Sequence, residues 1–176
     1  MVDETIKKFV EKHINLIEAK DFAKIYELID TNEAYDYGDE EGLYYNCGKL
    51  TDLFYKIGID PLEGSKKIYP NMFVRSEIDH FTFPKGICQI GNAAFYDCSN
   101  LKHIVIPFGV KKIPFECFGN TYLESIELPL SIASIDEEAF ASDNVFKVIC
   151  EEGSYAESWA NEQGLVTIPT KSYYNS

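Results

Sequence analysis

Three histidines, His13, His80 and His103, are the side chains whose type best suits metal binding or acid–base chemistry. His80 and His103 occupy the same place in two similar segments, so we expect them side by side on adjacent strands, about 5 Å apart. Zinc sites need several clustered ligands, and two histidines alone make a weak site. We interpret the pair as an exposed ladder, with a metal or catalytic pair as the alternative. His13 is interpreted as an interior or edge residue of a helix.

Other motifs associated with catalysis are missing from the sequence. It has no Gly-rich phosphate loop, no Ser-His-Asp order and no nucleophile elbow. The five cysteines are odd in number and include no CxxC pair, so they are predicted to be free, buried thiols. We therefore expect no enzyme activity, no cofactor and no metal. An enzyme with its site in residues 1–77 is the alternative, but no catalytic constellation supports it.

The charge of the chain limits the kinds of partner that we expect. The net charge is −13, and both residues 1–75 and residues 76–176 carry an acidic excess, which indicates no basic patch. Direct binding to nucleic acid or to an anionic membrane is disfavoured, because affinity for phosphates rests on Lys and Arg. The sequence shows no leader and no apolar run of about 18 residues. We therefore expect a cytoplasmic protein.

The N-terminal part of the chain has helical patterning. Apolar residues at i, i+3, i+4 and i+7 predict helices over about residues 5–17, 21–29 and 49–57. Residues 31–48 are predicted to form a solvated loop that is rich in acids. We include four of these acids among the candidate partner contacts: Asp36, Asp39, Glu40 and Glu41.

The rest of the chain is a repeat. Segments starting at Ile78, Leu101 and Leu123 each run to a proline six residues later, and each is followed by a second shared block ending in Phe. Self-similarity at a period of 22 to 23 residues predicts a solenoid. Each unit contributes six apolar positions that stack on those of its neighbours. The predicted columns contain Ile78, Phe81, Phe83, Ile87, Ile90, Phe95; Leu101, Ile104, Ile106, Val110, Ile113, Phe118; and Leu123, Ile126, Leu128, Ile132, Ile135, Phe140.

Terminal units of a solenoid need caps, because their apolar flanks would otherwise be bare. The helical residues 1–77 are predicted to cap the first unit. Ser154 and Glu157 form a capping-box pattern that predicts a C-terminal helix, with Gly164 at its end. We divide the chain into a helical cap or small domain (1–77), repeats (78–150), and a helical C-terminal cap and tail (151–176).

The repeated pattern is Leu-x-x-Ile-x-Ile-Pro-x-x-Val-x-x-Ile followed by Ala-Phe-x-x-Cys-x-x-Leu. Over about residues 76–166 it resembles the BspA-like (Treponema-type) leucine-rich repeat family. Unit two differs from the pattern by carrying Pro114 where unit one has Gly91. The resemblance implies an α+β fold: a short leucine-rich-repeat solenoid of three repeats and a partial fourth, with an α-helical N-terminal cap and a short C-terminal helix.

Outward positions of the predicted strands form two columns that solenoids use to bind partners. The candidate contacts are His80, His103, Ser125 and Lys147 in one column, and Thr82, Val105, Glu127 and Ile149 in the other. Val105 and Ile149 are predicted to be exposed apolar residues. The first hypothesis is an acidic, non-enzymatic protein-binding module, such as a phage or mobile-element inhibitor of a basic nucleic-acid-binding or defence protein. The alternative is a cell-surface adhesin or a fragment of one. The oligomeric state is left open.

Overall fold

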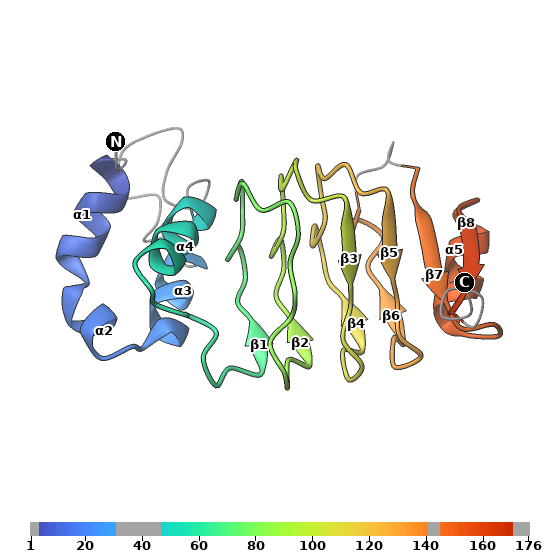
Figure 1. Ribbon diagram of the computed structural model, residues 1–176, viewed down its shortest axis with the longest axis horizontal. Helices are drawn as coiled ribbons and strands as arrows, with labels where there is room; N and C mark the ends of the chain where they lie inside the picture. The colour runs from blue at the N-terminus through green and yellow to red at the C-terminus, as the bar shows by residue number, and fades with distance from the viewer. Residues whose placement is uncertain (1–3, 31–46, 141–144, 171–176) are drawn as a thin grey trace.

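The computed structural model describes residues 4–30, 47–140 and 145–170. Figure 1 shows an elongated molecule with helices at one end, stacked strands in the middle, and a short helix beside the last strands at the other end. The helical end contains four helices in the described residues: α1 (Glu4–Lys12), α2 (Ile14–Glu18), α3 (Phe22–Asp30) and α4 (Cys47–Lys56). The helices predicted over residues 21–29 and 49–57 are therefore confirmed.

The single helix predicted over residues 5–17 is wrong. His13 has φ −114° and ψ 23°, which breaks the helix between α1 and α2. The apolar stripe of α1 buries Ile6 and Phe9, whereas α2 buries no residue. The stripe that the sequence shows as continuous is thus fully buried only in α1, whereas Leu16 and Ile17 of α2 pack against the core while partly exposed. The His13 ring lies beside that of Phe9, with 4.6 Å between ring centroids.

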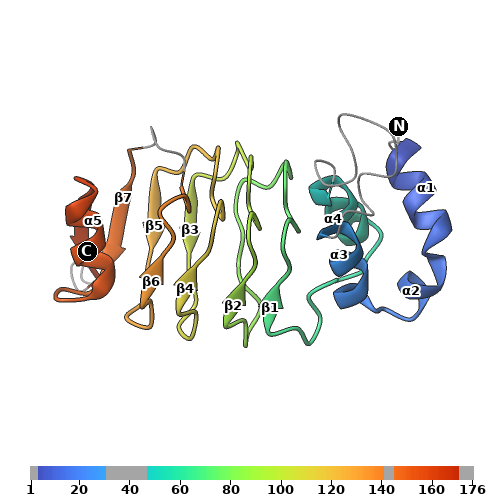
Figure 2. The same cartoon turned by 180° about the vertical axis from the view of Figure 1, so that it is seen from behind.

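The repeats form a solenoid of short parallel strands. Four strands form one sheet, which we call the front sheet: β3 (His103–Val105), β5 (Ser125–Glu127), β7 (Lys147–Cys150) and β8 (Val166–Pro169). Two further sheets have two strands each, β1 (Lys67–Ile68) with β2 (Gln89–Ile90), and β4 (Lys112–Ile113) with β6 (Ser134–Ile135). Every pairing is parallel, and strands from successive turns stack side by side (Figure 2). This arrangement confirms the predicted α+β leucine-rich-repeat solenoid.

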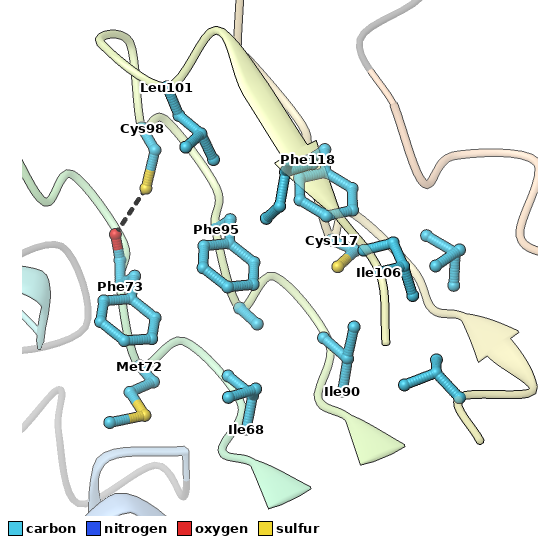
Figure 3. Close-up of a cluster of buried hydrophobic side chains, with 14 of the residues drawn as sticks. Ile68, Met72, Phe73, Ile90, Phe95, Cys98, Leu101, Ile106, Cys117 and Phe118 are labelled. Atoms are coloured by element: carbon cyan, nitrogen blue, oxygen red, sulfur yellow. Dashed lines mark hydrogen bonds between the residues drawn. The ribbon is translucent and has the colours of Figure 1, made fainter. Parts of the chain in front are cut away.

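The predicted apolar columns form the core. All six members in unit two are buried, and so are five in unit three. Ile78, Phe81 and Phe83 of unit one are half-buried and pack against the core. Phe73, Phe95 and Phe118 lie in one row through the stack (Figure 3). Their rings are stacked with centroids 5.1 and 5.4 Å apart, and Phe140 continues the row 5.5 Å beyond Phe118.

The helical end packs directly on the first turn of the solenoid. The Gly48 N–H in α4 donates to the Val74 carbonyl at 3.0 Å, and a Cβ at Gly48 would lie 2.4 Å from that oxygen. Only glycine permits such a close approach. Tyr26 of α3 donates to or accepts from the Thr51 hydroxyl at 2.7 Å, and its ring stacks on Tyr69. The apolar flank of the first turn is therefore covered by helices.

The other end is closed by α5 (Tyr155–Glu162) and β8. Ser154 Oγ accepts from the Glu157 N–H at 3.1 Å, which confirms Ser154 as the N-cap. The Glu157 carboxylate accepts from the Gly153 N–H at 2.8 Å, one residue before the position of a standard capping box. Trp159 of α5 lies against Phe140, with 5.4 Å between ring centroids. The aromatic row thus ends on the C-terminal helix.

Candidate functional site

The front sheet brings most of the predicted partner contacts into two rows. Parallel register aligns His103, Ser125, Lys147 and Val166 in the first row. The second row contains Val105, Glu127, Ile149 and Ile168. Because side chains alternate along a strand, both rows point to the same face, away from Ile104, Ile126 and Val148, which are buried in the core. We call these eight residues the outer face.

The residues of the outer face differ in exposure. His103, Val105, Lys147 and Val166 are exposed, whereas Ser125, Glu127 and Ile168 are half-buried. Val105 is 56% exposed and Val166 is 58% exposed, so the face has an accessible apolar side chain on each of its two edge strands. His80 and Thr82 are also exposed, although they lie before β3 and outside any strand.

The sequence predicts that Ile149 is exposed, and this prediction is wrong. Its side chain is only 6% exposed, although it lies outside the main core cluster. β8 pairs with β7 and places Ile168 beside Ile149, while Glu127 of β5 flanks the other side. The repeat pattern does not include β8, so it could not indicate that Ile149 lies on an interior strand of the sheet. Val166 and Ile168 are the face residues that the sequence did not identify.

The histidines have individual polar partners. His80 Nδ1 lies 2.6 Å from Asp79 Oδ1, and the pKa of that carboxyl is lowered by its hydrogen bond to the imidazole. His103 Nδ1 lies 2.9 Å from Ser125 Oγ, and its Nε2 lies 3.9 Å from a Glu124 oxygen. Among the described residues, no group of three or more His, Cys, Asp or Glu side chains could hold a metal ion. The geometry therefore favours the interpretation as exposed polar residues.

The acids predicted as further contacts, Asp36, Asp39, Glu40 and Glu41, lie outside the described residues. Within the described ranges, none of the helices has the length and apolar character of a membrane span.

All five cysteines are free, and four of them are buried. Burial raises the pKa of the Cys98 thiol to about 12, and the thiol donates to the Phe73 carbonyl at 2.9 Å. Burial also raises the pKa values of the Cys117 and Cys150 thiols. A thiol with a raised pKa is a poor nucleophile. These cysteines therefore act as small core residues, and Cys88 alone is partly exposed.

One surface feature runs against the expectation from net charge. A groove of about 590 Å³ is lined by lysines of two different turns: Lys67, Lys111 and Lys112. The even distribution of acids along the chain indicated no basic patch, but distribution along the sequence does not determine which side chains meet on a solenoid. The lysine pairs 66–67 and 111–112 stand at equivalent positions of their units, and this alignment was the signal that could have shown the groove.

The comparison with family models adds to this geometry. A model described as the BspA type leucine rich repeat region matches residues 66–160, in 6 copies. Searches of curated proteins and of solved structures found no match to this chain. The family match covers more than half of the chain, coincides with the stacked strands, and is typical of non-enzymatic modules that bind other proteins. The chain belongs to the BspA-type leucine-rich repeat family.

Proposed function

We propose that this protein is a non-enzymatic protein-binding module whose contact surface is the outer face of the front sheet. The observation that carries the proposal is the register of β3, β5, β7 and β8, which aligns four strands into one continuous face. A regular face of this kind is how solenoid proteins present an extended surface to a partner.

The composition of the face supports the proposal. Val105 and Val166 are exposed on the edge strands, with the polar side chains of His103, Ser125 and Glu127 between and beside them. Protein interfaces combine apolar contacts with polar groups that fix orientation and register. The strands are anchored by buried residues on their inner side, so the face is held by a packed core.

The acidic charge favours a basic partner. The net charge of the chain is −13, and the exposed carboxylate of Glu124 adjoins the face, 3.9 Å from His103 Nε2. Opposite charges speed the encounter of two proteins and orient it. On charge and size we propose that the module masks a basic surface, as an inhibitor from a phage or mobile element would. The adhesin-type role is the alternative, and the salt dependence of binding distinguishes the two.

The test is capture of partners on the immobilised protein, with quantification of each captured species. Val105→Lys removes an apolar contact and adds a positive charge to the face, so it should reduce capture of a genuine partner. Ile57→Lys is the matched control, because Ile57 is similarly exposed at 60% but belongs to the helical end. A partner retained equally by both variants contradicts the outer face as the contact surface. Capture unchanged between low and high salt contradicts electrostatic masking.

A further inference from the structure

The strand ladder is interrupted on the side of the solenoid where β1, β2, β4 and β6 lie (Figure 1). β1 pairs with β2 and β4 pairs with β6, but no backbone hydrogen bond joins β2 to β4 in the described ranges. Gly91 and Asp136 each donate a backbone N–H to the preceding turn, to Ile68 and Ile113 respectively. Pro114 stands at the equivalent place and has no N–H to donate. The proline therefore removes one of the hydrogen bonds that join the strands at the other two pairings.

The groove of about 590 Å³ lies at this break. It is lined by residues of both strand pairs and of the turn before β4: Lys67, Cys88, Gln89, Ile90, Gly91, Gly109, Lys111 and Lys112. None of these lining residues is acidic. The volume falls within the range of about 300–1,000 Å³ that is typical of small-molecule sites.

The lysines of the groove are only partly neutralised. Lys111 has no acidic partner among the described residues, and the Lys67 ammonium lies over the Tyr69 ring, 5.6 Å from its centroid, which leaves its charge intact. Lys112 has one ion pair, with Asp136 at 3.8 Å, and both side chains are solvent-accessible. A surface pair of this kind is weak. The groove thus concentrates positive charge on an otherwise acidic chain.

The next groove along the same side has the opposite character. It measures about 410 Å³ and is lined by Asp136, Glu137 and Glu138 with a single lysine, Lys112. The strands that flank this groove, β4 and β6, are paired, so the two grooves differ in backbone geometry as well as in side chains. Of these two grooves in the described part of the chain, only the β2–β4 groove is lined by several lysines and no acid.

The net charge of −13 does not cancel this local field at physiological salt. The Debye length at about 0.15 M salt is roughly 8 Å, so carboxylates on distant turns are screened. An anion in the groove senses mainly the lysines that line it. Lys is a regular ligand for phosphate, as a point charge with three donors.

We infer that the β2–β4 groove binds a small molecule bearing at least two phosphate or sulfate groups. The lysine ammoniums of both turns contact the anionic groups, and the Gln89 amide is available to a neighbouring hydroxyl or oxygen of the ligand. The two sources of such anions, a phosphorylated metabolite and a sulfated sugar, share this chemistry. This site is distinct from the outer face and does not depend on it.

Cys88 provides a local readout, since it is the only partly exposed thiol and lies in the groove wall. The experiment measures the rate at which a neutral maleimide labels Cys88, at about 0.15 M salt, with and without tripolyphosphate or a sulfated disaccharide. The unsulfated disaccharide is the neutral control. The inference predicts saturable slowing of labelling by at least one of the two anions and none by the neutral sugar. Which anion acts identifies the source.

Matched variants localise the effect. The double variant Lys67→Gln with Lys111→Gln should weaken binding of the anion by roughly tenfold or more, the usual consequence of losing charged hydrogen bonds. Lys49→Gln with Lys56→Gln removes the same charge from exposed positions of α4 and should change nothing. Circular dichroism verifies that both variants fold. Absence of protection by either anion, or equal weakening in both variant pairs, overturns the inference.

Discussion

The rings of Phe73 and Phe95 stack with their centroids 5.1 Å apart and an angle of 4° between their planes. Phe95 belongs to the first repeat that the sequence shows, whereas Phe73 lies before it. The stack therefore joins the turn that contacts the helices to the repeat array. Through Phe118, Phe140 and Trp159 the same aromatic row reaches the C-terminal helix. Packing along this row connects the two ends of the molecule.

Phe118→Ala should cost about 3–5 kcal/mol of unfolding free energy, because Phe118 is fully buried between two other rings. Chemical denaturation measures the loss. Phe108→Ala is the matched control: Phe108 is 80% exposed, so its truncation should change stability by less than about 0.5 kcal/mol. Comparable losses in the two variants would show that the row is not the centre of the core.

Gly48→Ala should destabilise the protein by about 1–3 kcal/mol, the usual range for overpacking. The added Cβ would meet the backbone of the first turn at Val74 and Ser76, and backbone atoms cannot rotate away. Lys49→Ala, at the exposed neighbouring position, should be neutral or slightly stabilising, since Ala favours helix. Thermal unfolding of both variants measures this. An unchanged transition for Gly48→Ala would mean that α4 does not pack on the turn as described.

Labelling of the native protein with a maleimide near pH 8 should modify Cys88 much faster than the other four cysteines. The buried thiols are inaccessible, and the raised pKa values of Cys98, Cys117 and Cys150 keep them protonated. Peptide mass spectrometry identifies the labelled site, and Cys88→Ser should abolish the fast phase. Fast labelling at any second cysteine would contradict the burial described for it.

Asp52→Asn should be more stable to unfolding than the wild type near neutral pH, and this advantage should be smaller in acid. Partial burial raises the pKa of Asp52, although its carboxylate accepts a hydrogen bond from Ser76 at 2.7 Å. The folded state therefore holds the proton more tightly than the unfolded state, and the wild type loses stability as pH rises through the raised pKa. The variant lacks this loss, so its advantage should grow with pH.

Melting temperatures of both proteins between about pH 3 and pH 7 measure the difference across the range in which Asp titrates. Glu137→Gln removes one negative charge from an exposed turn and controls for the general effect of the acidic net charge. An advantage for Asp52→Asn that is flat with pH, or equal to that of Glu137→Gln, would contradict the assigned cause.

The sequence predicted the repeat core well because apolar residues that recur in every repeat can be buried only by stacking between neighbouring turns. It did not identify the turn containing Ile68 and Phe73, since the strand motif with its proline is missing before them. The spacing from Ile68 to Phe73 equals that from Ile90 to Phe95, and that match was the available signal. Local pattern also could not show the helix break at His13, because the apolar spacing continues unbroken through residues 5–17.

The outer face was predicted only in part. Residues within the repeats, such as His103 and Val105, were placed on it correctly because strand side chains alternate. Ile149 was misjudged because its cover comes from β8, a strand outside the repeat pattern. The lysine groove was missed because charge was counted along the chain. Lys67 and Lys111 are far apart in the sequence and line the same groove only because the turns of the solenoid stack.

The central claim, that the outer face contacts a protein partner, is tested most directly by site-specific photocrosslinking. A photoreactive residue replaces Val105 on the outer face in one variant. In a second variant it replaces Ala133, an exposed residue that directly precedes β6 and lies outside the front sheet. Our account predicts a cross-linked partner from position 105 that is absent from position 133. The same partner should be lost when Lys replaces Val166. Cross-linking from position 133 but not from 105, or equally from both, would contradict the account.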